Sequence, residues 1–430
     1  MPDEMSSLPG PRLGAVRVGG SQPLPTGVRD APDLPQRDGP HPLAASSEDP
    51  RRDGLVDAGA TRTAAMVEAT AALHEGLGRL CPDTPGPALS AELMGRDGAV
   101  PPDDAGSTQR DLRLHAALIS PVRHLLDAGG KRWRAHLMAR VLEIYGVSPH
   151  RYAELIAACE MGHAGSLMVD DVEDTSPVRR GSPAAHMLFG EATAINAGTA
   201  AYFSVDRAIR RCFPDDAELR LAVYETYLAN LRATHAGQAL DIQGHQKEMT
   251  AALATGDPEP LLTMLTLTHR LKTGAQVRAV CEIASLAGRA TPQQRAALGE
   301  FGEAVGLAYQ ITDDVSDLRG VMHRDRATKR VAEDLHNAKV TFPLAHAVTL
   351  LPRDEAAELW RTLQAEPDER AVRRAARTID ASGAVQRCEE QATALLDQAW
   401  TAVRPHLPDS PHTTALAEAA TAVVRRTWNT

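Results

Sequence analysis

Two aspartate-rich stretches, EMGHAGSLMVDDVED (residues 160–174) and VGLAYQITDDVSD (residues 305–317), indicate both the fold and the chemistry of this chain. Each contains an apolar run typical of a buried helix, and each ends in the pattern Asp-Asp-x-x-Asp. Asp170 and Asp174 lie at i and i+4, so they share one helix face about 5–6 Å apart. Like charges at that spacing destabilise a bare helix and require a counter-charge. Magnesium, which prefers oxygen ligands and retains several waters, meets that need.

Asp171 completes the first cluster, and Asp313, Asp314 and Asp317 form the second. Two acidic clusters on separate buried helices are tolerated when they share cations across a cavity, although either one alone could be a solvated helix end. Neither has the alternating acids, central glycine and terminal glutamate of an EF-hand loop. The cationic pair Arg179-Arg180 follows the first cluster and suits an oxyanion. Together these features predict metal ions that hold an anionic ligand.

Helical periodicity extends from about residue 111 to the end of the chain. We expect helices at 112–127, 133–146, 150–174, 192–212, 216–246, 258–288, 292–318, 339–351, 354–365, 368–381, 385–402 and 411–428. Aromatic residues make up only 3% of the chain, β-branched runs are few, and there is no hairpin signal. The sequence therefore predicts an all-α protein with one large helical bundle domain over 111–430.

The N-terminal region has a different composition. Residues 1–60 hold ten of the 29 prolines and show no apolar periodicity, so we expect a disordered Pro/Gly-rich tail. Residues 61–110 are expected to form a helix from Thr63 to about Leu80, followed by a long loop over 82–108.

Charge and composition exclude several classes of protein. A net charge of -10 disfavours a nucleic-acid-binding surface, and no apolar stretch approaches the roughly 18 residues of a membrane span. The five scattered cysteines indicate reduced thiols rather than disulfides or a zinc site. We therefore expect a cytoplasmic protein. Only five of the 46 basic residues are lysines, and such positions favour a compact ammonium over a planar guanidinium.

The ordered motifs resemble those of the trans-isoprenyl diphosphate synthases, the polyprenyl synthetase family, over about 111 to at least 350. Besides the aspartate clusters, they are Gly129-Gly130-Lys131-Arg132-Trp133-Arg134, Arg179-Arg180-Gly181, Gly237-Gln238-x-x-Asp241, Lys272-Thr273-Gly274, Tyr309-Gln310 and the segment 333–344. Residues 193–203 and 333–344 are most similar to geranylgeranyl diphosphate synthases. The resemblance implies the isoprenoid synthase fold, prenyl transfer and a homodimer.

The resemblance also implies the role of each site residue. Isopentenyl diphosphate would be bound by Lys131, Arg134, His163 and Arg180. The allylic diphosphate would be bound by three magnesium ions together with Arg179, Lys272, Lys329 and Lys339. Asp170, Asp174 and Asp313 would be direct metal ligands, and Asp171, Asp314 and Asp317 would act directly or through water. Thr273 and Gln310 would direct oxygens at the allylic cation. Gln238 and Asp241 would orient the lysines or simply join two helices.

In this family, bulky residues just before the first aspartate motif limit the length of the product. Gly165 and Ser166 are small, which disfavours ten- and fifteen-carbon products. Met161, one turn below Gly165, would then close the tunnel, with Tyr202 and Phe203 as further candidates. We therefore expect a twenty-carbon product, with a synthase of longer chains (C25 or more) as the alternative.

Two functions of other classes remain. A class I terpene cyclase shares the first motif, but it normally carries an Asn/Ser/Glu motif in place of the second and needs no isopentenyl diphosphate site. A non-catalytic subunit of a prenyl synthase should have lost acidic ligands, whereas all six aspartates are present here.

Overall fold

The computed structural model describes residues 66–95, 107–320, 322–323, 326–327 and 332–428, all within one unit, Asp53–Thr430. Three predictions fall outside the described residues: the disordered tail over 1–60, the start of the first helix at Thr63, and the role of Lys329. The continuation of that helix over 66–80 is confirmed.

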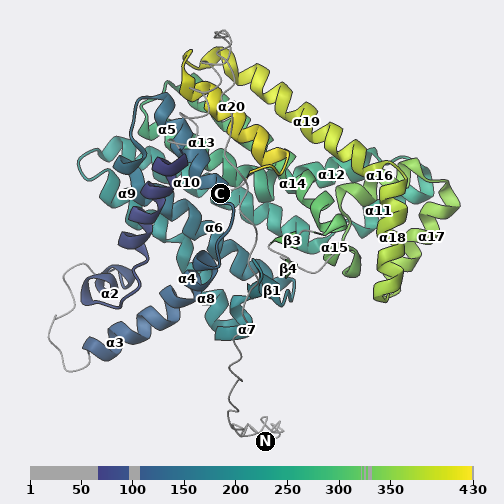
Figure 1. The fold of residues 1–430 in the computed structure, drawn as a ribbon, viewed down its shortest axis with the longest axis horizontal. Helices are drawn as coiled ribbons and strands as arrows, with labels where there is room; N and C mark the ends of the chain where they lie inside the picture. Colours follow the sequence, from purple (N-terminus) through teal and green to yellow (C-terminus); the bar gives the residue numbers. More distant parts are fainter. Residues whose placement is uncertain (1–65, 96–106, 321, 324–325, 328–331, 429–430) are drawn as a thin grey trace, which may run out of the picture. The chain divides into compact units, whose positions relative to one another are not determined.

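The fold is all-α, as predicted, and Figure 1 shows its helices in chain order. After the helix at 66–80 come α2 (Pro87–Leu93), α3 (Ser107–Leu114), η1 (His115–Ile119), α4 (Ser120–Asp127), α5 (Trp133–Ile144), η2 (Pro149–Tyr152), α6 (Ala153–Glu173), α7 (Ala185–Phe189), α8 (Glu191–Tyr202), α9 (Ser204–Cys212) and α10 (Ala217–Gln243). The second half holds α11 (Gln246–Thr255), α12 (Glu259–His269), η3 (Arg270–Gly274), α13 (Ala275–Ala287), α14 (Pro292–Arg319), α15 (Glu333–His336), α16 (Phe342–Leu350), α17 (Arg353–Gln364), α18 (Glu369–Ala381), α19 (Ala384–Val403), η4 (Arg404–His406) and α20 (Pro411–Val424).

The differences from the expected helices are local. The loop expected over 82–108 contains α2, whose Pro87 occupies a first-turn position that proline favours. The helix expected over 192–212 is interrupted at Phe203, and the helices α7, α11 and α15 were missed altogether. Two short antiparallel pairs were also missed: β1 (Val178–Arg179) with β2 (Ser182–Pro183), and β3 (Met322–His323) with β4 (Arg326–Ala327).

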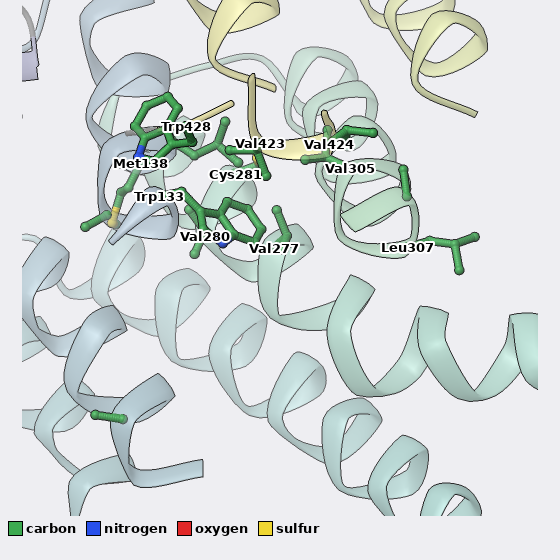
Figure 2. Close-up of a cluster of buried hydrophobic side chains, with 14 of the residues drawn as sticks. Trp133, Met138, Val277, Val280, Cys281, Val305, Leu307, Val423, Val424 and Trp428 are labelled. Atoms are coloured by element: carbon green, nitrogen blue, oxygen red, sulfur yellow. The ribbon is translucent and has the colours of Figure 1, made fainter. Parts of the chain in front are cut away.

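The interior is built around α13 and α14, which pack against each other and against α10, α5 and α19. Figure 2 shows part of this core, where Trp133 and Met138 from α5 meet Val277 and Cys281 from α13. The same cluster includes Trp428, beyond the end of α20. The core therefore joins the N-terminal half of the bundle to the last segment of the described chain. Within the described ranges, no helix has both the length and the apolarity needed to cross a lipid bilayer.

Candidate functional site

The first aspartate cluster ends α6. Asp170 is the most highly connected of its members: its Oδ1 accepts hydrogen bonds from Lys272 Nζ at 3.0 Å and from Gln238 Nε2 at 3.1 Å. Burial alone would raise its pKa, but the cations of Lys272 and Arg179 hold the pKa of Asp170 below its usual value. Burial and the neighbouring Asp170 carboxylate raise the pKa of the more exposed Asp174 to about 6. The two carboxylates thus share a helix face, and a cation bound there would relieve the burial and repulsion that raise the pKa of Asp174.

Arg179 is positioned by the β1–β2 pair that follows α6. The two residues of its turn, Arg180 and Gly181, both have positive φ, as in the type I′ turns that close two-residue hairpins. Such turns usually contain Asn-Gly, so Arg-Gly gave no hairpin signal in the sequence. The turn directs Arg179 back to α6, where Nε donates to Asp171 Oδ1 at 2.7 Å. Asp171 is 1% exposed, so this aspartate holds the arginine in place and does not face the solvent.

Arg180 points to the other side of the hairpin. Its Nη1 donates to the carbonyls of Leu125 and Gly129, and its Nη2 contacts Glu160 Oε1 at 3.4 Å. Gly130 makes this approach possible, because a Cβ there would lie 2.8 Å from the guanidinium carbon of Arg180 and its φ is +134°. Arg180 therefore anchors the loop that carries Lys131.

A pair of lysines converges on one buried carboxylate of α10. Asp241 Oδ2 accepts from Lys272 Nζ at 2.7 Å and from Lys339 Nζ at 2.8 Å. These two ammonium groups outweigh burial and hold the pKa of Asp241 far below its usual value. Gly237, one turn earlier, allows α10 to lie against η3: a Cβ there would overlap the backbone nitrogen of Lys272 and lie 2.6 Å from the carbonyl carbon of Leu271. Asp241 is thus in position to orient both lysines, whereas Gln238 bonds to Asp170.

The second aspartate cluster lies near the end of α14, and its three members differ in environment. Asp313 is half-buried and forms an ion pair with Arg426. Asp314 and Asp317 are buried; the former accepts from Gln310 Nε2 and the backbone N–H of Phe342, and the latter from the N–H of Asp334. Burial raises the pKa of Asp314 to about 8. Asp313 is therefore the most accessible of the three predicted metal ligands in this cluster.

Thr273 and Gln310 lie next to each other, as a shared catalytic role requires. Thr273 Oγ1 donates to Gln310 Oε1 at 2.8 Å. Thr273 belongs to η3, a π-helical turn of the kind that often marks functional sites. Gln310 also donates to Asp314, so this chain of polar groups connects η3, between α12 and α13, to the second aspartate cluster.

A second group of basic side chains surrounds the loop before α5. Arg134 is buried, its Nη1 lies 3.3 Å from His163 Nε2, and its guanidinium carbon lies 4.4 Å from the centre of the Trp133 ring. Burial lowers the pKa of His163 well below its usual value, so the imidazole is neutral. Arg134 Nε and His163 Nδ1 are buried without a hydrogen-bond partner among the described residues. Such groups normally have partners, so this arrangement suits an anionic ligand. Burial, reinforced by Arg426, lowers the pKa of the neighbouring Lys131 to about 8.

The predicted chain-length residues do not all face the same space. A Cβ on Gly165 would overlap the carbonyl oxygen of Gly198 on α8 and lie 2.8 Å from Ala201 Cβ, so Gly165 packs against α8. Met161 is a core residue at 2% exposure, and Phe203 is 69% exposed. Phe203 therefore lies at the surface and not at a buried tunnel floor, whereas the role expected of the buried Met161 stays a prediction.

Three other residues lie closer to the acidic face, the side of α6 that carries Asp170 and Asp174. Ser166 is half-buried one turn before Asp170. A Cβ on Gly162, one turn earlier still, would meet no atom within 4 Å. Tyr202 is half-buried, and its ring centre lies 5.7 Å from that of His235 on α10. Motif spacing alone did not single out Gly162, because only the packing of α6 shows which of its glycines has space beside it.

Sequence reasoning also missed Arg426, which contacts Asp313 and lies with its guanidinium carbon 4.2 Å from the Tyr309 ring centre. The signal available was weak: an Arg-Arg pair after the last apolar helix.

The donor set fits divalent cations of the magnesium type, because Asp170, Asp174 and Asp313 supply accessible carboxylate oxygens. Within the described part of the chain, no three acidic, histidine or cysteine side chains converge closely enough to hold a metal ion alone. Lysine and arginine side chains neutralise two of the three carboxylates instead. A metal ion that binds Asp170 or Asp313 must therefore compete with these cations or bind together with an anion.

An all-α bundle with two aspartate-rich helices and two groups of basic side chains has the architecture of an isoprenoid synthase. The family model Polyprenyl synthetase matches residues 115–379, so the chain belongs to this family and is a trans-prenyltransferase.

Known relatives make different products. The chain is 34% identical to a farnesyl diphosphate synthase of Geobacillus stearothermophilus over 234 residues, which covers 53% of this chain and 74% of the relative. It is 32% identical to a geranylfarnesyl diphosphate synthase of Aeropyrum pernix over 285 residues, 64% and 83% of the two chains. Among solved structures, a polyprenyl synthase from Caulobacter crescentus complexed with calcium and isoprenyl diphosphate aligns with a TM-score of 0.61 at 26% identity, over 71% of this chain and 88% of that one.

Proposed function

We propose that the enzyme condenses isopentenyl diphosphate with an allylic diphosphate (dimethylallyl, geranyl or farnesyl) and that its main product is geranylgeranyl diphosphate. The observation that carries this proposal is the presence of two separate groups of basic side chains. Lys272 and Lys339 contact carboxylates at the end of α6 and on α10, whereas Arg134 lies against His163, two turns before Asp170. A condensation of two diphosphates needs two anion sites, whereas a terpene cyclase needs one.

The allylic diphosphate is bound at the first group. Magnesium ions on Asp170, Asp174 and Asp313 would neutralise the leaving diphosphate. Lys272, Lys339 and Arg179 add fixed positive charge there, and Asp241 and Asp171 hold these side chains in place. Thr273 and Gln310 direct oxygen atoms at the allylic carbon as it becomes positive, so preorganised dipoles stabilise the developing cation.

Isopentenyl diphosphate is bound at the second group. Arg134 Nε and His163 Nδ1 supply buried polar atoms for its oxygens, and Lys131 adds a cation. Arg180 contributes by holding the 129–130 loop, and its long contact to Glu160 can exchange for a diphosphate oxygen. The double bond of this substrate attacks the allylic carbon, the carbon–oxygen bond to the departing diphosphate breaks, and the released diphosphate accepts the proton that restores a double bond.

A twenty-carbon product is supported by the small residues on the acidic side of α6. Ser166 and Gly162 lie one and two helical turns before Asp170, and neither places a bulky side chain on this side of α6. The relatives make fifteen-carbon and twenty-five-carbon products, so the proposed length lies between theirs.

One incubation tests the proposal: purified protein, magnesium, labelled isopentenyl diphosphate and, in turn, dimethylallyl, geranyl or farnesyl diphosphate. We expect geranylgeranyl diphosphate from each starter. Products of twenty-five carbons or more would instead identify a longer-chain synthase. A hydrocarbon released from the starter alone would identify a cyclase, and absence of turnover would support a non-catalytic subunit.

We also propose that the enzyme is a homodimer. Six large apolar side chains are exposed on α7, α8 and α10: Met187, Leu188, Ile195, Leu221, Leu228 and Ile242. Burying such side chains against a second copy would stabilise the pair. Sedimentation equilibrium should give a dimer, which Leu228→Glu weakens. Leu350→Glu, the same change at an exposed position of α16, should leave the dimer intact.

A further inference from the structure

The chain beyond α20 turns into the candidate active site. Arg426 Nη1 donates to Tyr309 Oη at 3.1 Å, its Nε lies 3.3 Å from Thr312 Oγ1, and its Nη2 forms an ion pair with Asp313. Two residues later, Trp428 Nε1 donates to the carbonyl of Lys131 at 2.9 Å. The segment therefore connects the second aspartate cluster on α14 to the basic loop before α5.

Arg426 adopts an unusual backbone conformation to reach this position. Its φ is +59°, in the left-handed region that glycine normally occupies just after a helix. A residue with a side chain disfavours this conformation, so the contacts of the guanidinium must compensate for it. The neighbouring Arg425 is exposed, which makes it a matched reference residue.

We propose that Arg426 occupies Asp313 in place of a metal ion and that metal binding releases its guanidinium to bind the diphosphate of isopentenyl diphosphate beside Lys131 and Arg134. This inference rests on the proposed function, because it takes Asp313 as a metal ligand. Asp313 cannot offer the same oxygen to a guanidinium and to a magnesium ion. Arg426 is moreover close enough to Lys131 to help lower the pKa of that lysine, so it already lies near the proposed diphosphate site.

The arrangement makes the order in which metal and isopentenyl diphosphate bind important. Without metal, the Arg426 guanidinium neutralises Asp313 and is unavailable to an anion. Once a metal takes Asp313, the same guanidinium becomes an additional cation for the second diphosphate. Binding of metal and binding of isopentenyl diphosphate therefore favour each other through a single side chain.

The test compares Arg426→Gln with Arg425→Gln in two binding experiments without turnover. Manganese binding is followed by the electron paramagnetic resonance signal of the free ion. The dissociation constant of isopentenyl diphosphate, measured by calorimetry with metal present and no allylic substrate, is the second readout. We expect Arg426→Gln to bind manganese about tenfold more tightly and isopentenyl diphosphate about tenfold more weakly, since a fixed charge near both ligands is removed. Arg425→Gln should match the wild type in both.

Arg426→Lys is the control for a general loss of folding, because it replaces the same side chain but keeps the positive charge. Its manganese affinity should lie near that of the wild type. Unchanged or weaker manganese binding in Arg426→Gln would overturn the inference, as would unchanged affinity for isopentenyl diphosphate. Failure of the proposed function would look different: the wild type would not elongate any allylic starter, whatever the effect of Arg426 on metal binding.

Discussion

Phenylalanine introduced along α6 should shorten the prenyl chain in steps set by the pitch of the helix. Ser166 lies one turn and Gly162 two turns before Asp170, and Gly162 has open space where a side chain would begin. One turn advances the helix by about 5.4 Å. A five-carbon unit adds four chain bonds of about 1.5 Å to a zigzag hydrocarbon, which extends it by roughly 5 Å. Moving the obstruction by one turn should therefore change the product by one five-carbon unit.

The assay supplies labelled isopentenyl diphosphate and geranyl diphosphate and separates the products by chain length after removal of the diphosphate. The longest product of Ser166→Phe should be one unit shorter than that of Gly162→Phe, and both should be shorter than that of the wild type. Equal lengths in the two variants, or wild-type length in either, would refute the reasoning that this side of α6 lines the growing chain.

Gly165→Ala separates a steric effect on the product from a steric effect on the fold. Its Cβ would overlap the carbonyl oxygen of Gly198, so α6 and α8 must move apart. Overpacking of this kind costs about 1–3 kcal/mol of unfolding free energy, measurable by urea denaturation, while the remaining activity should keep the wild-type product length. A shortened product with unchanged stability would show that Gly165, as the motif spacing suggested, faces the chain after all.

Three further changes test the binding machinery. Gly237→Ala should lower both stability and kcat, because its Cβ collides with the backbone of Lys272; Gly78→Ala, whose Cβ would meet open space, is the control in thermal unfolding and turnover. Asp241→Asn should cost about 3–5 kcal/mol in urea unfolding, because two half-buried ammonium groups lose the buried carboxylate that they share; a loss below about 1 kcal/mol would contradict that. With the pKa of Lys131 at about 8, kcat/KM for isopentenyl diphosphate should fall above pH 8 as the ammonium is deprotonated, and Lys131→Arg should remove that fall. Identical pH profiles for the two proteins would rule out Lys131 as the titrating group.

Much of the fold could be predicted because the apolar periodicity of the long helices is strong. The expected segments 133–146, 216–246 and 292–318 correspond to α5, α10 and α14 with ends shifted by at most three residues. Pairs of carboxylates at i and i+4 on buried helices also identified the acidic face of the site, since that pattern has few other stable explanations.

The remaining features depend on contacts between distant residues. Gly162 and Gly165 are equivalent in the sequence, yet one has space beside it and the other meets α8. The position of Arg426 depends on how α20 packs against α5 and α14, which no local pattern encodes. The turn at Arg180-Gly181 forms without its usual asparagine, because Arg180 finds carbonyl partners that compensate for its positive φ.

The scarcity of lysine has a geometric explanation at Asp241. One oxygen of this carboxylate accepts from both Lys272 and Lys339, at 2.7 and 2.8 Å. An ammonium is a compact charge that can share a single oxygen with a second ammonium. A guanidinium presents a planar fork that matches both oxygens of one carboxylate, so two arginines would compete for the same edge of Asp241. The shared carboxylate keeps two mutually repelling cations close together, where both can act on one diphosphate. In a chain with 41 arginines, these positions therefore require the smaller cation.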